Sequence, residues 1–195
     1  MGRPIEFNRD EAIALVMNEI WEHGYDASSV KAISEKLGIT RSSFYNAFGS
    51  REELFLEVLR AYNGPPLREW FPINDTCSVL KVISEKLRNI CKERLDDPAA
   101  RGCLAINSVI ELVGKHAQLG PVIEEEFSTN IEFFENLLAV AVDRGELDNC
   151  DLHVKAQALQ SLIIGLNVMS KLVRNEDELW AVTKHNLEAL GLYRE

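Results

Sequence analysis

The sequence predicts an all-α protein with two domains. Along most of the 195 residues, apolar side chains recur at the three- and four-residue spacing of a helix, and no segment shows the alternation of a strand. Glycine or proline separates these periodic segments, so the chain divides into short helices followed by longer ones. We expect a small helical domain over residues 1–50 and a larger helical domain over residues 51–195.

The first predicted helix runs from Asn8 to His23. Its apolar positions, with one glutamate among them, have the mixed pattern of a packed bundle element; they are Ala12, Leu15, Val16, Glu19 and Ile20. Gly24 ends this helix, and Tyr25 begins the following loop. We expect Tyr25 to pack in the core.

Residues 28–51 predict two short helices joined by a tight turn. Ser28 or Ser29 can cap the first helix by accepting a hydrogen bond from a free backbone N–H. Gly38 can end this helix because glycine tolerates the left-handed conformation. Thr40 can cap the second helix, which we expect to run from Arg41 to about Ala47.

The second of these helices has one apolar face and one polar face. Phe44 and Phe48 are four residues apart, so they share a face and should anchor the helix. The remaining positions carry hydrogen-bond donors and one cation, and they are Arg41, Ser42, Ser43, Tyr45 and Asn46. A short helix with these properties fits the major groove of DNA. The pattern therefore predicts a helix-turn-helix.

Candidate DNA contacts fall into two groups. We expect Arg41, Ser42 and Asn46 to face base edges, because their positions on the second helix point them away from the Phe anchors. Thr40, Ser43, Tyr45 and Arg51 are candidates for phosphate contacts. Ser28, Ser29 and Arg3 complete the expected set, with Arg3 in an N-terminal arm that can enter a minor groove; a frayed terminus is the alternative.

The N-terminal residues resemble the TetR family of transcriptional regulators. The resemblance covers about the first sixty residues and is carried by Gly2-Arg3-Pro4, the WEHGY segment 21–25, Leu37-Gly38-Ile39, Ser43-Phe44-Tyr45 and residues 50–55. It implies a homodimer that binds a palindromic DNA operator and responds to a small-molecule effector in its C-terminal domain. The fold implied is an N-terminal three-helix helix-turn-helix DNA-binding domain followed by a helical ligand-binding and dimerisation domain.

The remainder of the chain predicts further helices. Ser50 and Glu53 can form a capping box for a helix that ends before Gly64-Pro65-Pro66, and we expect a loop at 70–72. Later helices are predicted over residues 76–95, 101–113, 120–144, 152–173 and 177–190.

The last two helices carry more apolar residues than one narrow stripe requires. They can form an intrachain hairpin or a two-fold interface with a second copy, and the TetR resemblance favours a four-helix dimer bundle. The expected interface residues are Leu159, Leu162, Ile163, Leu166, Met169, Leu179, Trp180, Thr183 and Leu187.

Cys103 is a candidate redox sensor. The segment Arg101-Gly102-Cys103-Leu104 resembles a TetR subgroup in which some members respond to oxidants or electrophiles through a cysteine at this place. A neighbouring arginine and a helix N-terminus both favour a thiolate, whereas a small buried hydrophobe is the commoner role of a free cysteine. Other candidates for an effector site, each with a core role as the alternative, are Tyr62, Trp70, Asn107, Phe127, Ile131 and Phe134.

Charge and composition exclude several classes of site and protein. The net charge is −10, of which residues 1–51 contribute −1 (six basic, seven acidic) and the rest −9 (15 basic, 24 acidic). This distribution is compatible with a DNA-binding end that is less acidic than the remainder. Neither CxxC pairs nor HExxH spacing occurs, so we expect no metal and no cofactor.

The remaining expectations concern location and rival functions. There is no signal-peptide pattern and no run of about 18 apolar residues, so we expect a cytoplasmic protein without membrane contact. A helical enzyme would need clustered acid–base or nucleophilic groups, which the dispersed histidines and cysteines do not form. A helical protein-interaction module is the other alternative.

Overall fold

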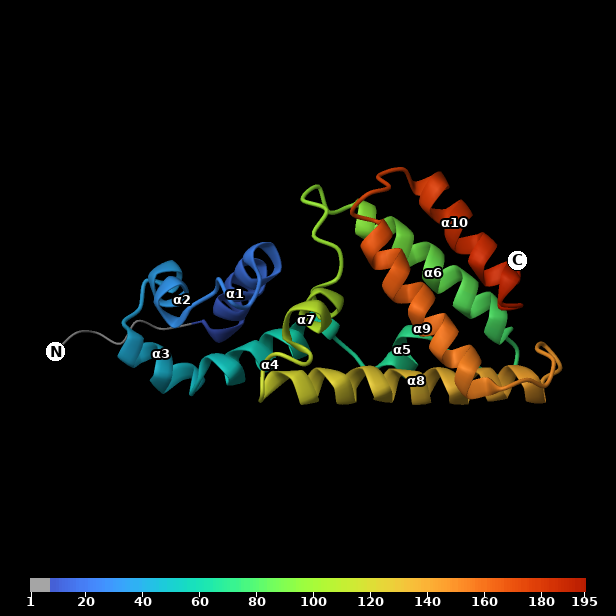
Figure 1. The fold of residues 1–195 in the computed structure, drawn as a ribbon, viewed down its shortest axis with the longest axis horizontal. Helices are drawn as coiled ribbons and strands as arrows, with labels where there is room; N and C mark the ends of the chain where they lie inside the picture. Colours follow the sequence, from blue (N-terminus) through green and yellow to red (C-terminus); the bar gives the residue numbers. More distant parts are fainter. Residues whose placement is uncertain (1–7) are drawn as a thin grey trace. The chain divides into compact units, whose positions relative to one another are not determined.

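The computed structural model describes residues 8–195, and no strand occurs in this range. The fold is all-helical, as the spacing predicts (Figure 1). The helices in chain order are α1 (Arg9–His23), α2 (Val30–Leu37), α3 (Arg41–Phe48), α4 (Arg51–Asn63), α5 (Leu67–Trp70), α6 (Val79–Leu95), α7 (Leu104–Leu112), α8 (Leu119–Asp143), α9 (Leu152–Met169) and α10 (Glu176–Ala189).

The chain forms two compact units. Among the described residues, the first unit consists of residues 8–64 together with residues 107–123, and the second of residues 65–106 and 124–195. The expected boundary lay after residue 50, but α4 packs extensively on α1 and so belongs to the first unit. The segment 107–123 joins the same unit from a distant part of the sequence.

The predicted capping residues start the helices of the first unit. Ser29 accepts a hydrogen bond from Ala32 N, Thr40 from Ser43 N, and Ser50 from Glu53 N. Gly38 ends α2 in the left-handed conformation with φ 66°, which confirms the turn expected at this residue. These capping hydrogen bonds and the left-handed Gly38 define α2 and α3 as two consecutive short helices.

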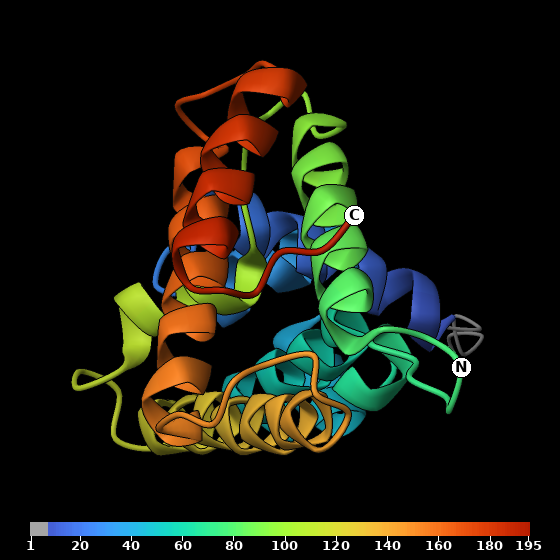
Figure 2. The same cartoon turned by 90° about the vertical axis from the view of Figure 1, so that its right-hand side faces the viewer.

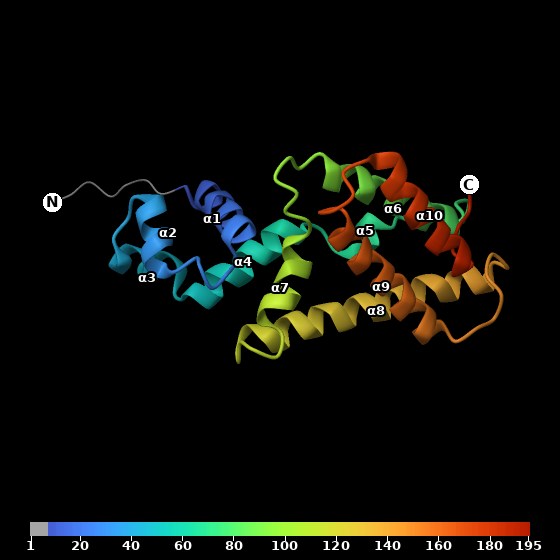
Figure 3. The ribbon, with the colours of Figure 1, turned by 45° about the horizontal axis from the view of Figure 1, so that its top comes forward.

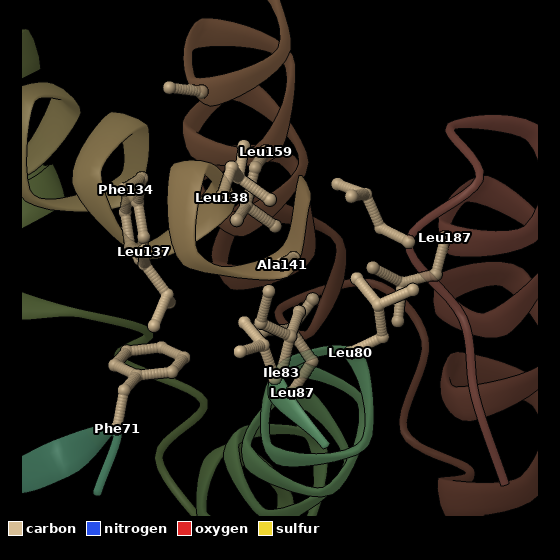
Figure 4. Packing of buried hydrophobic residues seen from close by; sticks show 13 residues of the cluster. Phe71, Leu80, Ile83, Leu87, Phe134, Leu137, Leu138, Ala141, Leu159 and Leu187 are labelled. Atoms are coloured by element: carbon tan, nitrogen blue, oxygen red, sulfur yellow. The ribbon is translucent and has the colours of Figure 1, made fainter. Parts of the chain in front are cut away.

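The second unit has a core between α6, α8, α9 and α10. Figure 2 shows α6, α9 and α10 side by side, and Figure 3 shows α9 lying across α8. Leucine and phenylalanine side chains from these helices meet in one cluster (Figure 4), which includes Ile83, Leu87, Leu138, Leu159 and Leu187 at 0% exposure. Burial of such side chains provides the main stabilisation of the unit.

The structure adjusts two local expectations. A loop was expected at 70–72, but Trp70 is the last residue of the short helix α5; the non-helical residues begin at Phe71, which is buried in the core cluster. Helix α7 begins at Leu104 rather than at Arg101, because the preceding residues Ala100 and Gly102 both adopt positive φ angles of 51° and 74°. Cys103 consequently lies directly before the first residue of α7.

Candidate DNA-binding surface

The turn between α2 and α3 is short and well determined by hydrogen bonds. Ile39 N donates to Ser34 O over 3.0 Å, which closes the end of α2 around Gly38. Thr40 Oγ1 accepts from Ser43 N at 3.1 Å and lies 3.0 Å from Ser43 Oγ. The start of α3 therefore presents two hydroxyl groups that are already oriented.

Helix α3 separates its aromatic anchors from its polar face. Phe44 and Phe48 are buried at 0% and 4% exposure, with ring centroids 5.4 Å apart. Tyr45 is 52% exposed and packs edge-on against Phe44. The remaining polar side chains of the helix are all exposed, and they are Arg41, Ser42, Ser43 and Asn46.

Most basic residues around α3 are held in ion pairs. Lys36 pairs with Glu19, and Lys31 with Glu35. Arg41 makes no ion pair within residues 8–195 and is exposed at the first position of α3. Its guanidinium group is therefore available to an external acceptor.

Arg9 has a structural role that sequence reasoning missed. Its Nη1 donates to Ala47 O at 2.6 Å, and its Nε and Nη2 donate to Glu57 at 2.7 and 2.6 Å. The hydrogen bond from Arg9 holds the pKa of Glu57 below its usual value. Arg9 thus ties the C-terminal end of α3 to α1 and α4, over sequence separations that no local pattern reveals.

The other predicted contact residues lie in different surroundings. Ser28 is completely buried, and its hydroxyl donates to Gly24 O at 2.7 Å, so its side chain faces the interior. Ser29 is exposed and is used as the cap of α2. Arg51 is half-buried, with its guanidinium carbon 4.0 Å from the ring centroid of Tyr25. Arg3 lies outside the described residues.

Tyr25 is completely buried, as expected of a packing residue. Burial raises the pKa of Tyr25, so its hydroxyl remains a neutral donor, and it donates to Glu52 Oε1 at 3.2 Å. The pKa of Glu52 is lowered, first by a hydrogen bond from its own backbone N–H and further by the Tyr25 hydroxyl.

Comparison with known families identifies this arrangement. Residues 13–58 match the model of the bacterial regulatory proteins of the tetR family, and residues 84–185 match the tetracyclin repressor-like C-terminal domain. The chain belongs to the TetR family. It is therefore a DNA-binding transcriptional regulator, with α2 and α3 as its helix-turn-helix.

Individual TetR-family relatives agree with this assignment. The chain is 27% identical over 182 residues to the HTH-type transcriptional regulator YezE of Bacillus subtilis, covering 92% of this chain and 94% of YezE. It is 27% identical over 175 residues to the transcriptional repressor ComR of Escherichia coli, covering 87% of this chain and 82% of ComR.

A solved TetR-family structure is similar over nearly the whole chain. A cysteine mutant of the regulator CifR, complexed with 26 bp of double-strand operator DNA, superposes with a TM-score of 0.83 at 28% sequence identity. The match covers 96% of this chain and 99% of the CifR chain.

The predicted effector-site residues are divided between the two units. Tyr62 and Asn107 belong to the first unit, where Tyr62 packs edge-on against Trp21 at 5.1 Å. In the second unit, Phe134 is buried in the core cluster, and Trp70 and Ile131 pack against it. Phe127 is half-buried, and its backbone oxygen accepts a hydrogen bond from Gln160. These side chains have structural partners of their own.

The predicted interface residues also divide by burial. Leu159, Leu166, Leu179, Thr183 and Leu187 are 0–3% exposed and belong to the interior of the protomer. Leu162, Ile163 and Trp180 are half-buried, and Met169 is 37% exposed. A groove of about 450 Å³ lies between α9 and α10 and is lined by residues that include Ser161, Leu162, Gly165, Met169, Val182 and Asn186.

Neither a membrane-spanning helix nor a metal-binding cluster is found in the part of the chain that the structure describes. Within residues 8–195, no helix combines the length and the apolar character needed to cross a membrane. In the same range, no three histidine, cysteine, aspartate or glutamate side chains are grouped as they would be around a metal ion.

Proposed function

We propose that this TetR-family regulator is a homodimeric repressor that is released from a palindromic operator by an effector acting on its second unit. The observation that supports DNA reading by α3 is its exposed polar face, which includes the unpaired Arg41 and stands opposite two buried Phe anchors. Repression is supported by the relative ComR, which is named as a repressor. Such a protein acts in the cytoplasm, where it meets the chromosome.

The contacts can be assigned by position on α3 and its neighbours. Arg41, Ser42 and Asn46 would meet base edges, and Thr40, Ser43, Tyr45 and Arg51 would meet phosphates. Ser29 and Arg3 would add backbone and minor-groove contacts. Ser28 is omitted from this set because its side chain is buried.

Selection of random duplex DNA on the purified protein tests the proposal directly. We expect enrichment of an inverted repeat, because each recognition helix reads only a few base pairs and a dimer reads two half-sites. Affinity for the selected duplex should fall steeply as salt rises from about 50 to about 200 mM. Failure to enrich any sequence at low salt would contradict sequence-specific binding.

Replacement of Arg41 should weaken operator binding. If Arg41 reads guanine, Arg41→Ala should lower affinity by about 1–3 kcal/mol on the selected operator and relax the preference at one base pair. Titration of labelled duplexes that differ at single positions measures both effects. Arg68→Ala is the matched control, because Arg68 is an exposed arginine of the second unit on α5. An equal loss on all duplexes would make Arg41 a phosphate contact.

The dimer face is proposed to be the groove between α9 and α10. TetR-family regulators act as dimers, and α9 and α10 carry several exposed apolar side chains, including Val168, Met169 and Val182. Gly165 has no atom within 4 Å of where a Cβ would be, so a helix of a second copy can approach closely there.

Cys103 is the proposed point of thiol modification. It is half-exposed and directly precedes α7, and the adjacent Gly102 lies against the Lys171 side chain and accepts a hydrogen bond from Arg94. A small-molecule effector in the second unit is the other route to release.

Replacement of Cys103 separates these two routes. Cys103→Ser should abolish the release of operator DNA by hydrogen peroxide, as measured by fluorescence anisotropy, while binding before oxidation is unchanged. Cys150→Ser, which removes another half-exposed thiol, should respond like the parent protein. If Cys103→Ser is released as readily as the parent, the effector is not a thiol oxidant acting at this residue.

A further inference from the structure

Helix α7 holds the turn that follows α1. Glu111, in the last turn of α7, accepts hydrogen bonds from Tyr25 N at 3.0 Å and from Asp26 N at 2.8 Å. Each carboxylate oxygen is used by one backbone N–H, and such charge-assisted bonds are stronger than neutral ones. All three residues lie in the first compact unit, although Glu111 is 86 and 85 residues away from its partners.

Gly24 makes this approach possible. A Cβ at residue 24 would lie 3.0 Å from Glu111 Oε1, and the φ of +85° disfavours any side chain there. The carboxylate therefore occupies the space that a side chain would fill. The turn is additionally closed by the Ser28 hydroxyl, which donates to Gly24 O.

The residue held in this way supports a cation on the first turn of α4. The Tyr25 ring is packed edge-on against Phe55 and His116, with centroids 5.0 and 5.4 Å away. The guanidinium carbon of Arg51 lies 4.0 Å from the centre of the same ring. Arg51 also makes a side-chain hydrogen bond to Tyr25, so one residue holds the guanidinium in two ways. A guanidinium carries five N–H donors, and this hydrogen bond leaves others for a further acceptor.

We propose that Glu111 is a positioning residue for DNA binding, which acts by fixing Tyr25 so that its ring places the guanidinium of Arg51 for a phosphate contact. The proposal rests on the phosphate role proposed above for Arg51. Arg51 is half-buried and makes no ion pair within residues 8–195, so a phosphate is a suitable acceptor for the donors that its hydrogen bond to Tyr25 does not use.

Net charge alone gives the opposite expectation. Removal of a carboxylate makes the protein less negative, which by itself favours binding to DNA. Loss of affinity in a variant without the Glu111 carboxylate would therefore reflect positioning. A purely structural role would lower the melting temperature but would leave the number of phosphate contacts unchanged.

Salt titration of operator binding counts those contacts. On the selected operator duplex, Arg51→Ala should reduce the slope of log affinity against log salt concentration by about 0.9, the value for one phosphate. Glu111→Ala should reduce the slope by a similar amount. The double variant should bind no more weakly than Arg51→Ala alone, because both changes remove the same contact.

Two further variants keep the test interpretable. Glu111→Gln retains one acceptor oxygen for the two N–H groups, so its operator affinity should lie between those of the parent and of Glu111→Ala. If Glu111→Ala does not fold, Glu111→Gln takes its place in the salt titration. Glu124→Ala removes an exposed carboxylate from α8 and should leave the salt slope unchanged.

The outcomes distinguish the two proposals. If Arg51→Ala binds the operator with the parent affinity and slope, the phosphate role of Arg51 is wrong. Two results would overturn the positioning role of Glu111 while Arg51→Ala reduces the slope. In the first, the Glu111 variants keep the parent slope. In the second, the affinity lost in the double variant equals the sum of the losses in the two single variants.

Discussion

Truncation of Phe44 should cost about 3–5 kcal/mol of unfolding free energy, the usual cost of removing a buried aromatic side chain. Phe44 is completely buried and contacts the rings of Phe48 and Tyr45, so Phe44→Ala removes the main anchor of α3. Operator binding should be lost in parallel, because the recognition helix no longer has a fixed position. Chemical denaturation and anisotropy measured on the same preparation check both effects.

The neighbouring tyrosine provides the matched control. Tyr45 lies on the same helix but is 52% exposed, so Tyr45→Ala should change stability by less than about 1 kcal/mol. It should still weaken operator binding, since we propose that its hydroxyl contacts a phosphate. If Phe44→Ala and Tyr45→Ala had equal effects on stability, the assignment of inner and outer faces of α3 would be wrong.

Local sequence signals were sufficient to predict the helix-turn-helix. The caps at Ser29, Thr40 and Ser50 and the left-handed Gly38 each depend on residues within one turn of the chain. Capping and glycine preferences act over that distance, and tertiary contacts reinforce them here. The anchors Phe44 and Phe48 follow from helical periodicity alone.

Contacts between distant segments could not be predicted in the same way. Arg9 meets Ala47 O and Glu57, and Glu111 meets the backbone of Tyr25 and Asp26, over separations of 38 to 86 residues. Backbone carbonyl and N–H groups are present at every position, so no residue type marks these partners in the sequence. Ser28 was misplaced for a different reason: its partner, Gly24 O, is only four residues away, but a serine side chain has the same type whether it faces solvent or the preceding turn.

Helix α9 shows a different limit. Its apolar residues occupy most of its circumference, so periodicity does not separate the side that packs in the protomer from the side that would meet a second copy. The structure separates them: Leu159 and Leu166 are buried inside the protomer, whereas Met169 remains partly exposed. The sequence alone can therefore predict that a helix both packs inside the protomer and meets a second copy, but it does not show which residues do which.

Introduction of a charge in the groove between α9 and α10 should prevent dimer formation without damaging the protomer. A Cβ at Gly165 meets no atom within 4 Å, so a side chain fits there in the isolated chain. Replacement of a helical glycine by a better helix former should stabilise the protomer by about 0.5–1 kcal/mol. In a dimer, however, the carboxylate of Gly165→Glu would be buried without a partner, which is strongly unfavourable.

We therefore expect Gly165→Glu to be a folded monomer that unfolds in a cooperative thermal transition. It should have little affinity for the palindromic operator. Sedimentation velocity measures the oligomeric state, and anisotropy measures binding to whole and half operators. Ser128→Glu, which adds the same charge at an exposed position of α8, should remain a dimer that binds the operator normally. A dimeric Gly165→Glu variant would show that the groove is not the interface. A monomeric variant that binds the whole operator as tightly as the parent would show that dimerisation is not what provides affinity for two half-sites.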